Sequence, residues 1–209
     1  MRENSSNLWR FARAYSIILV TNINRERGGE ESMNIWHDIS PERIKPEDFI
    51  SVIEIPKGCK NKYEVDKETG MLILDRILYT STHYPANYGF IPRTYAEDGD
   101  PLDVLVLCSE DISSMSLVRC YPIGHILMID EGAEDIKVIA VPFKEPTWNV
   151  FRDVSDLPPH IVEEIKHFFG VYKQLEGKTM KVLQLFGRER TLEVISQAIE
   201  EYERRFPRS

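Results

Sequence analysis

The chain has 209 residues, of which 42% are hydrophobic and 29% are charged, a composition typical of one globular domain with an appendage and unlike that of a disordered chain. Its formal net charge of −8 disfavours nucleic acid and anionic membranes as its main partners. The three cysteines form no close pair, so a disulfide framework and a zinc knuckle are disfavoured, and a reducing, cytoplasmic location is expected.

Residues 1–32 differ from the rest of the chain, because they show no sustained periodicity and contain a Gly28-Gly29 pair. Their longest apolar run, residues 17–20, is too short for a membrane span or a signal peptide. We expect a poorly ordered extension whose first codon is a mis-assigned start, with Met33 as the natural beginning of a domain over residues 33–209. An Arg-rich targeting peptide is the alternative, and it is weakened by the glutamates among these residues, Glu3, Glu26, Glu30 and Glu31.

From Phe49 onward, short apolar runs separated by Gly, Pro and Asp predict strands over residues 50–55, 62–66, 71–78, 102–107, 116–129 with a break, and 136–142. A helix is predicted from about Pro158 to Gln174, capped by Ser155 or Asp156. A second helix carries one apolar stripe, formed by Leu192, Ile195, Ile199, Tyr202 and Phe206. Many short strands followed by two helices favour the α+β class, with a closed or nearly closed β-barrel covered by helices.

Three charged residues break the alternation of these strands. Glu54, Arg76 and Asp103 each share a strand face with apolar neighbours. Burial of an isolated charge costs several kcal/mol, so we expect these groups to meet one another, a metal or a charged ligand at the mouth of the barrel. The alternative is that each strand is an edge strand with a solvated face.

Two acidic clusters are more specific. Residues 97–103 carry three aspartates around a Gly-Asp-Pro turn, and residues 130–135 carry two more. Crowded carboxylates repel one another unless cations lie between them, and Mg²⁺ prefers such oxygen ligands. An EF-hand is excluded because Pro101 and Leu102 occupy positions where that loop needs ligands and a turn. The alternative is two solvated acidic turns.

Cations and phenols accompany these carboxylates. Lys62 shares a strand face with Glu64, Lys137 follows the second cluster, residues 84–89 are predicted to form a turn with two tyrosines, and Tyr172-Lys173 ends the first helix. Such groups donate to the oxygens of a polyanionic ligand. Tyr172 also fits a core position.

Residues 97–104, EDGDPLDV, resemble the signature of the soluble, metal-dependent inorganic pyrophosphatases of family I. The resemblance extends through residues 52–56, 62–67, 74–76, 84–89, 130–137 and 172–173, in order along most of residues 50–175. It implies a small closed Greek-key, OB-like β-barrel flanked by two C-terminal helices.

The resemblance also implies an inorganic diphosphatase that uses several Mg²⁺ ions per site. It would hydrolyse inorganic pyrophosphate to two orthophosphates by direct attack of a metal-activated water, with no covalent intermediate. Asp100 would be the general base. The metal ligands would be Asp98, Asp103, Asp130, Asp135, Glu54 and Glu131. The phosphate contacts would be Lys62, Arg76, Tyr88, Lys137, Tyr172 and Lys173, supported by Glu64 and Tyr84.

Many bacterial relatives carry two histidines four residues apart on the first helix, at a subunit contact, whereas this chain has His167 but Val171. A pH-sensitive assembly through that pair is therefore not expected. The length of residues 33–209 is that of the compact hexameric members, so a homohexamer is favoured. The competing functions are a catalytically silent metal-binding barrel and a nucleotide-cleaving hydrolase; the latter is disfavoured because no glycine-rich phosphate cradle precedes the acidic turns.

Overall fold

The computed structural model describes residues 34–207. The predicted N-terminal extension, residues 1–32, lies outside the described residues. Within the described part of the chain, no helix is both long enough and apolar enough to span a bilayer.

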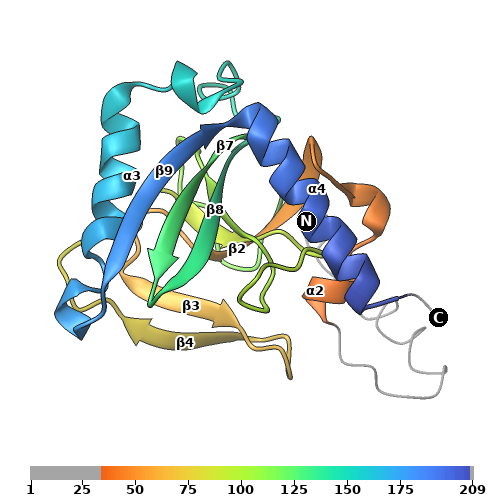
Figure 1. Ribbon diagram of the computed structural model, residues 1–209, viewed down its shortest axis with the longest axis horizontal. Coiled ribbons are helices and arrows are strands. Elements are labelled where there is room, and N and C mark those ends of the chain that lie inside the picture. The colour runs from red at the N-terminus through yellow and green to blue at the C-terminus, as the bar shows by residue number, and fades with distance from the viewer. Residues whose placement is uncertain (1–33, 208–209) are drawn as a thin grey trace, which may run out of the picture. The chain divides into compact units, whose positions relative to one another are not determined.

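Five strands form a closed ring; of these, β2, β7 and β8 are labelled in Figure 1. They pair in the order β2 (Asp48–Ile55), β5 (Asn87–Phe90), β6 (Asp103–Val106), β8 (Ala133–Pro142) and β7 (Leu117–Asp130). Strand β7 then pairs with β2, with Phe49 opposite Cys120, and this pairing closes the ring. All pairs are antiparallel except β6 with β8. Together with the two C-terminal helices, the ring confirms the predicted α+β fold with an OB-like barrel.

Further elements surround the ring. Strand β1 (Ile44–Lys45) pairs with β2, and β9 (Met180–Gly187) pairs with β7. Strands β3 (Asn61–Val65) and β4 (Leu72–Ile77) form a separate hairpin between β2 and β5 in the chain. The remaining short elements are α2 (Ile35–Asp38) and the 3₁₀ helices η2 (Pro41–Arg43), η3 (Val154–Asp156) and η4 (Gln174–Glu176).

Helices α3 (Pro159–Val171) and α4 (Arg188–Arg205) cover different apolar clusters. Strand β6 sends Leu105 to the cluster that contains Phe168 of α3, and Val104 to the cluster that contains Ile195 of α4. Because successive side chains point to opposite faces, both faces of this strand are buried. Asp103, the first residue of β6, therefore belongs to a strand whose backbone is held in place by packing on both faces.

The structure corrects several local expectations. Ser155 and Asp156 do not cap α3; they lie in η3, which Asp153 caps, while α3 follows Pro158 with no side-chain cap. Residues 84–89 are not simply a turn, because β5 begins at Asn87. The Asn87 carboxamide oxygen accepts from the backbone N–H groups of Lys57 at 3.0 Å and Ile112 at 2.7 Å, which satisfies a turn-favouring side chain inside a sheet.

The last helix also differs in detail from its predicted stripe. Its buried residues are Thr191, Ile195, Ala198 and Tyr202. Leu192 and Ile199 lie on the flanks with intermediate exposure. The helical period was therefore predicted correctly, but the buried face is centred about one residue from the predicted stripe.

Candidate active site

One cavity of about 340 Å³ collects most of the residues that the sequence singled out. Among the fifteen predicted site residues, the lining includes Glu54, Lys62, Glu64, Tyr88, Asp98, Asp100, Asp103, Asp130, Asp135, Lys137, Tyr172 and Lys173. These side chains come from β2, β3, β5, β6, β7, β8, the loop before β6 and the end of α3. The fold thus brings to one place residues up to 119 positions apart, from Glu54 to Lys173.

The carboxylates approach the cavity from two backbone features. Asp98 and Asp100 lie in the loop between β5 and β6, where Asp98 Oδ1 accepts from the backbone N–H of Asp100 at 3.0 Å. Asp103 is the first residue of β6 and stands opposite Lys137 of β8. Asp130 ends β7 and Asp135 follows on β8, joined by a tight turn in which Glu131 has a φ of 48°. Two unrelated turns therefore direct acidic side chains toward one cavity.

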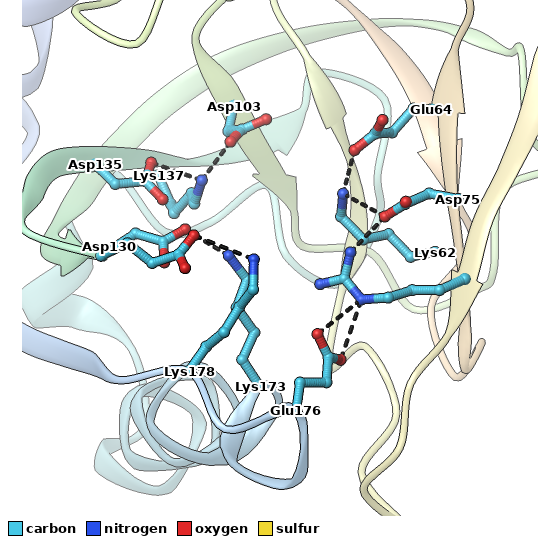
Figure 2. A network of polar contacts seen from close by, with 12 residues as sticks. Lys62, Glu64, Asp75, Asp103, Asp130, Asp135, Lys137, Lys173, Glu176 and Lys178 are labelled. Carbon is cyan, nitrogen blue, oxygen red and sulfur yellow. Dashed lines mark hydrogen bonds and ion pairs between the residues drawn. The ribbon is translucent and has the colours of Figure 1, made fainter.

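Two lysines stand among these carboxylates (Figure 2). Lys137 lies between Asp103 and Asp135, 2.6 Å from Asp135 Oδ1, and its side chain is only 6% exposed. Lys173 lies 2.5 Å from Asp130 Oδ2. Although burial opposes its charged form, the carboxylates of Asp103 and Asp135 raise the pKa of Lys137, so this ammonium group stays charged in the interior.

The site carries more negative charge than its lysines balance. Burial, followed by repulsion from Asp103 and Glu64, raises the pKa of Glu54 to about 8, although the backbone N–H of Val65 donates to Glu54 Oε1 at 2.8 Å. Burial and the neighbouring Asp103 also raise the pKa of Asp98 and of Asp135. Raised carboxyl pKa values at one site show that additional positive charge there would be stabilising.

Two buried phenols border the carboxylates. Burial raises the pKa of Tyr88 and of Tyr172 well above the usual range, and the charge of Asp135 adds to the effect at both. Both hydroxyls therefore remain protonated and can donate hydrogen bonds. The Tyr172 ring is held by Phe168, with centroids 5.2 Å apart, and by Phe169 at 5.6 Å. Tyr172 is thus both a core residue and a lining residue.

Three predicted residues do not line the cavity. Arg76 pairs with Asp75, which also accepts from Lys62 of the lining at 3.0 Å. Tyr84 is buried, with its ring centroid 5.3 Å from that of Tyr88. Glu131 pairs with Lys178 at 3.1 Å, and its side chain is more than half exposed. Arg76 and Tyr84 thus contact lining residues or their partners, whereas Glu131 is exposed and follows the lining residue Asp130 in the chain.

The donor set fits divalent cations. Within residues 34–207, no three histidine, cysteine or acidic side chains already stand in a ready metal-binding group; lysine ammonium groups lie between the carboxylates instead. However, Oδ1 of Asp130 is buried without a hydrogen-bond partner in the described structure. A buried carboxylate oxygen is costly unless it is satisfied, and hard oxygen ligands are those that Mg²⁺ takes. The residues present therefore fit a cluster of such ions.

Sequence reasoning gave no role to several lining residues. The cavity wall also contains Asn34, Ile35 and Trp36 at the start of the described chain, and Lys67 in the β3–β4 turn. Lys67 lies in residues 62–67, one of the segments that carry the family resemblance, and this was the one sequence feature that could have pointed to it. Nothing in the sequence connects Trp36 to residues so far along the chain.

A small barrel with carboxylates, lysines and phenols around one cavity is suited to binding a polyanion together with divalent cations. The comparisons with known proteins agree with that class. Residues 51–203 match the family described as inorganic pyrophosphatase. The chain therefore belongs to the inorganic pyrophosphatase family, whose members are diphosphatases, and the predictions of this family and of an enzyme are confirmed.

Individual relatives are similar over most of their length. The inorganic pyrophosphatase of Aquifex pyrophilus is 48% identical over 172 residues, covering 81% of this chain and 97% of the relative. Soluble inorganic pyrophosphatase 2 of Chlamydomonas reinhardtii is 47% identical over 171 residues, covering 82% and 89%. The crystal structure of inorganic pyrophosphatase from Thermus thermophilus superposes with a TM-score of 0.76 at 39% identity, covering 82% and 99%.

Proposed function

We propose that this chain hydrolyses inorganic pyrophosphate to two orthophosphates in a Mg²⁺-dependent reaction, by direct attack of water and without a covalent intermediate. The observation that carries the proposal is the convergence of acidic, lysine and tyrosine side chains on one cavity, with a buried oxygen of Asp130 left without a partner. Family membership supports the substrate.

Asp98, Asp103, Asp130 and Asp135 are the proposed metal ligands, with Glu54 beside them and Glu131 next to Asp130 in the chain. When bound, Mg²⁺ ions neutralise phosphate charge and lower the pKa of the attacking water. Carboxylates held by Lys137 and Lys173 are oriented before any ion arrives. Because phosphoryl transfer is loose, such positioning and charge stabilisation provide most of the rate acceleration.

Asp100 is the proposed general base. Its side chain is about half exposed at the cavity, at 53%, so it can reach a water there and accept its proton. Water oxygen bonds to one phosphorus, the bridging P–O bond breaks, and the second orthophosphate leaves. Neither step calls for a side-chain nucleophile, and Cys120, buried with its pKa raised to about 12, stays a thiol.

The charge of the departing phosphate is met by donors. Lys62, Lys137 and Lys173 supply ammonium groups, and Tyr88 and Tyr172 supply protonated hydroxyls. Arg76, which shares the partner Asp75 with Lys62, is proposed to contact phosphate, while Glu64 orients Lys62 and Tyr84 orients Tyr88.

The test is phosphate release from pyrophosphate with Mg²⁺, with Ca²⁺ and with chelator. Mg²⁺-dependent release that collapses in Asp100→Asn, while Glu193→Gln on the exposed face of α4 stays active, would support the proposal. A folded, Mg²⁺-loaded protein that releases nothing would favour the silent metal-binding barrel. Faster release from ATP than from pyrophosphate would favour the nucleotide-cleaving hydrolase.

We also propose a cytoplasmic homo-oligomer, with a hexamer favoured. All three cysteines of the chain are free thiols, which suits a reducing compartment. Strand β4 and its flanks expose a row of large apolar side chains, Met71, Ile73, Leu74, Ile77 and Tyr79, which is typical of a surface that another subunit covers. Sedimentation equilibrium of wild type and Ile73→Asp tests this proposal, since a monomeric wild type would contradict it.

A further inference from the structure

Lys67 is a cation of the cavity wall that the function described above does not use. Its ammonium group pairs with Oδ1 of Asp100 and also lies 5.4 Å from the centroid of the Trp36 ring. Lys67 and Trp36 both line the cavity. One lysine therefore links the hairpin β3–β4, the short helix α2 and the acidic loop before β6.

The backbone that carries Lys67 is held by its own turn. Oδ2 of Asp66 accepts from the backbone N–H of Thr69 at 3.2 Å. The N–H of Gly70 donates to the carbonyl of Asp66 at 2.8 Å, with Gly70 at a φ of 68°. Because these hydrogen bonds close the turn, they limit the positions available to the side chain of Lys67.

Trp36 is also fixed in place. Its Nε1–H donates to the carbonyl of Thr94 at 2.9 Å, and its ring stacks on His37 with centroids 4.8 Å apart. The Thr94 hydroxyl accepts from the backbone N–H of Leu102 at 2.8 Å, so the residue that holds Trp36 also holds the end of the acidic loop. The indole is only 8% exposed and offers a rigid face to the ammonium group.

We infer that Lys67, supported by the ring face of Trp36, is a positioning residue for Asp100. The inference rests on the proposed role of Asp100 as general base. An aspartate on a loop with half of its side chain exposed has several orientations, and an ammonium group on one oxygen selects among them. The other oxygen is then directed to accept a proton, which is the condition that general base catalysis sets on geometry.

Kinetics separate positioning from phosphate binding. Lys67→Gln is expected to lower kcat about tenfold, within the range that misplacement of a catalytic group costs, while KM for pyrophosphate changes less than twofold. Lys67→Arg is expected to restore most of kcat. A large rise in KM with kcat unchanged would overturn the inference, because it would make Lys67 a phosphate contact. Lys166→Gln, which removes an exposed ion pair on α3, is the matched control.

A double variant tests whether Lys67 acts through Asp100. If it does, adding Lys67→Gln to Asp100→Asn lowers the residual kcat no further. An additional tenfold loss in the double variant would show that Lys67 acts independently, and would contradict the inference.

The contact itself has a readout that needs neither metal nor turnover. The chain contains three tryptophans, Trp9, Trp36 and Trp148, so a Trp9→Phe/Trp148→Phe background leaves Trp36 as the sole tryptophan, which is excited selectively over the tyrosines. In metal-free protein, Lys67→Gln is expected to change the intensity of Trp36 emission. Salt at 1 M is expected to move the background protein toward the spectrum of Lys67→Gln, because both partners of the ion pair are exposed.

The outcomes are distinguishable. Turnover in the wild type, with neither kcat nor Trp36 emission altered by Lys67→Gln, removes the inference and leaves the proposed function intact. If the wild type does not hydrolyse pyrophosphate but Lys67→Gln still alters Trp36 emission, the proposed function is contradicted, and with it the catalytic part of the inference.

Discussion

Glu176 holds Arg76 in place: Nε of Arg76 lies 3.0 Å from Oε2 of Glu176, and the Glu176 side chain is only 9% exposed. The contact joins β4 of the hairpin to η4, just after α3, across 100 positions of sequence. Arg76 also pairs with Asp75, which accepts from Lys62 of the cavity wall. Glu176 therefore orients a series of ion pairs that runs through Arg76 and Asp75 to Lys62 in the cavity wall.

Glu176→Gln is expected to raise KM for pyrophosphate by about three- to tenfold while kcat stays within twofold, because it weakens a charge-assisted contact worth about 1–2 kcal/mol. Steady-state kinetics at saturating Mg²⁺ measure this effect. Glu163→Gln, at an exposed position of α3, is the control. An unchanged KM would show that Arg76 needs no such support, or that it does not contact the substrate.

Tyr172→Phe is expected to lower kcat/KM about tenfold, the equivalent of about 1.4 kcal/mol, by removing one hydroxyl donor from the cavity. The melting temperature should change little, because the ring contacts with Phe168 and Phe169 remain. Tyr79→Phe, at a residue 66% exposed on the flank of β4, is the matched control. Wild-type kinetics in Tyr172→Phe would mean that Tyr172 is only a core residue.

The sequence predicted four of the five ring strands, because each of these four has its own signal; β5 was missed, since residues 84–89 were interpreted as a turn. The apolar runs around Val52, Val104 and Val138 are bounded by turn residues, and because apolar residues follow one another in each run, both faces of the strand carry apolar side chains. The two acidic clusters were also recognisable locally. Their convergence on one cavity followed from the family resemblance and not from spacing alone.

What the sequence could not predict depends on long-range or one-sided contacts. Strand β9 was missed because it is an edge strand, which pairs with β7 alone among the described strands, and because three of its eight residues are exposed and none is buried, so it lacks a clear period. The contacts of Arg76 with Glu176 and of Lys67 with Trp36 join residues whose proximity only the tertiary fold creates. Asn87 was interpreted as a turn residue, since nothing in the sequence shows the two backbone N–H groups that donate to its side-chain oxygen.

Gly89→Ala is expected to lower the free energy of unfolding by about 3 kcal/mol or more, at the upper end of what overpacking costs. A Cβ at this position in β5 would lie 1.8 Å from the carbonyl oxygen of Val52 in β2, a backbone atom that cannot move without opening the ring. Urea denaturation measures the change. Gly170→Ala in α3 is the control, since its Cβ meets nothing within 4 Å, and it is expected to stabilise by about 0.5–1 kcal/mol. Equal effects of the two substitutions would contradict this account.

His125 on β7 ties the stability of the barrel to pH. Its ring is 2% exposed and stacks on Phe186 with centroids 4.8 Å apart. The Thr191 hydroxyl donates to the carbonyl of Gly187 at 2.8 Å, so its oxygen accepts from Nδ1–H of His125, also at 2.8 Å. In the neutral imidazole, the contact therefore places the proton on Nδ1.

Burial, together with the charge of Arg190, lowers the pKa of His125 from 6.5 to about 4. Between these two pH values the unfolded chain therefore binds a proton at His125, whereas the folded chain does not. The stability contributed by the neutral ring is complete above pH 6.5 and is lost as the pH falls toward 4. The full effect is about 3 kcal/mol. The difference in free energy of unfolding between wild type and His125→Gln, measured by urea denaturation at one protein concentration from pH 7 to pH 4.5, should shrink as the pH falls. His160→Gln, at an exposed residue, should follow the wild type at every pH. Parallel curves for His125→Gln and wild type would show that the folded barrel accepts a charged imidazole at this position.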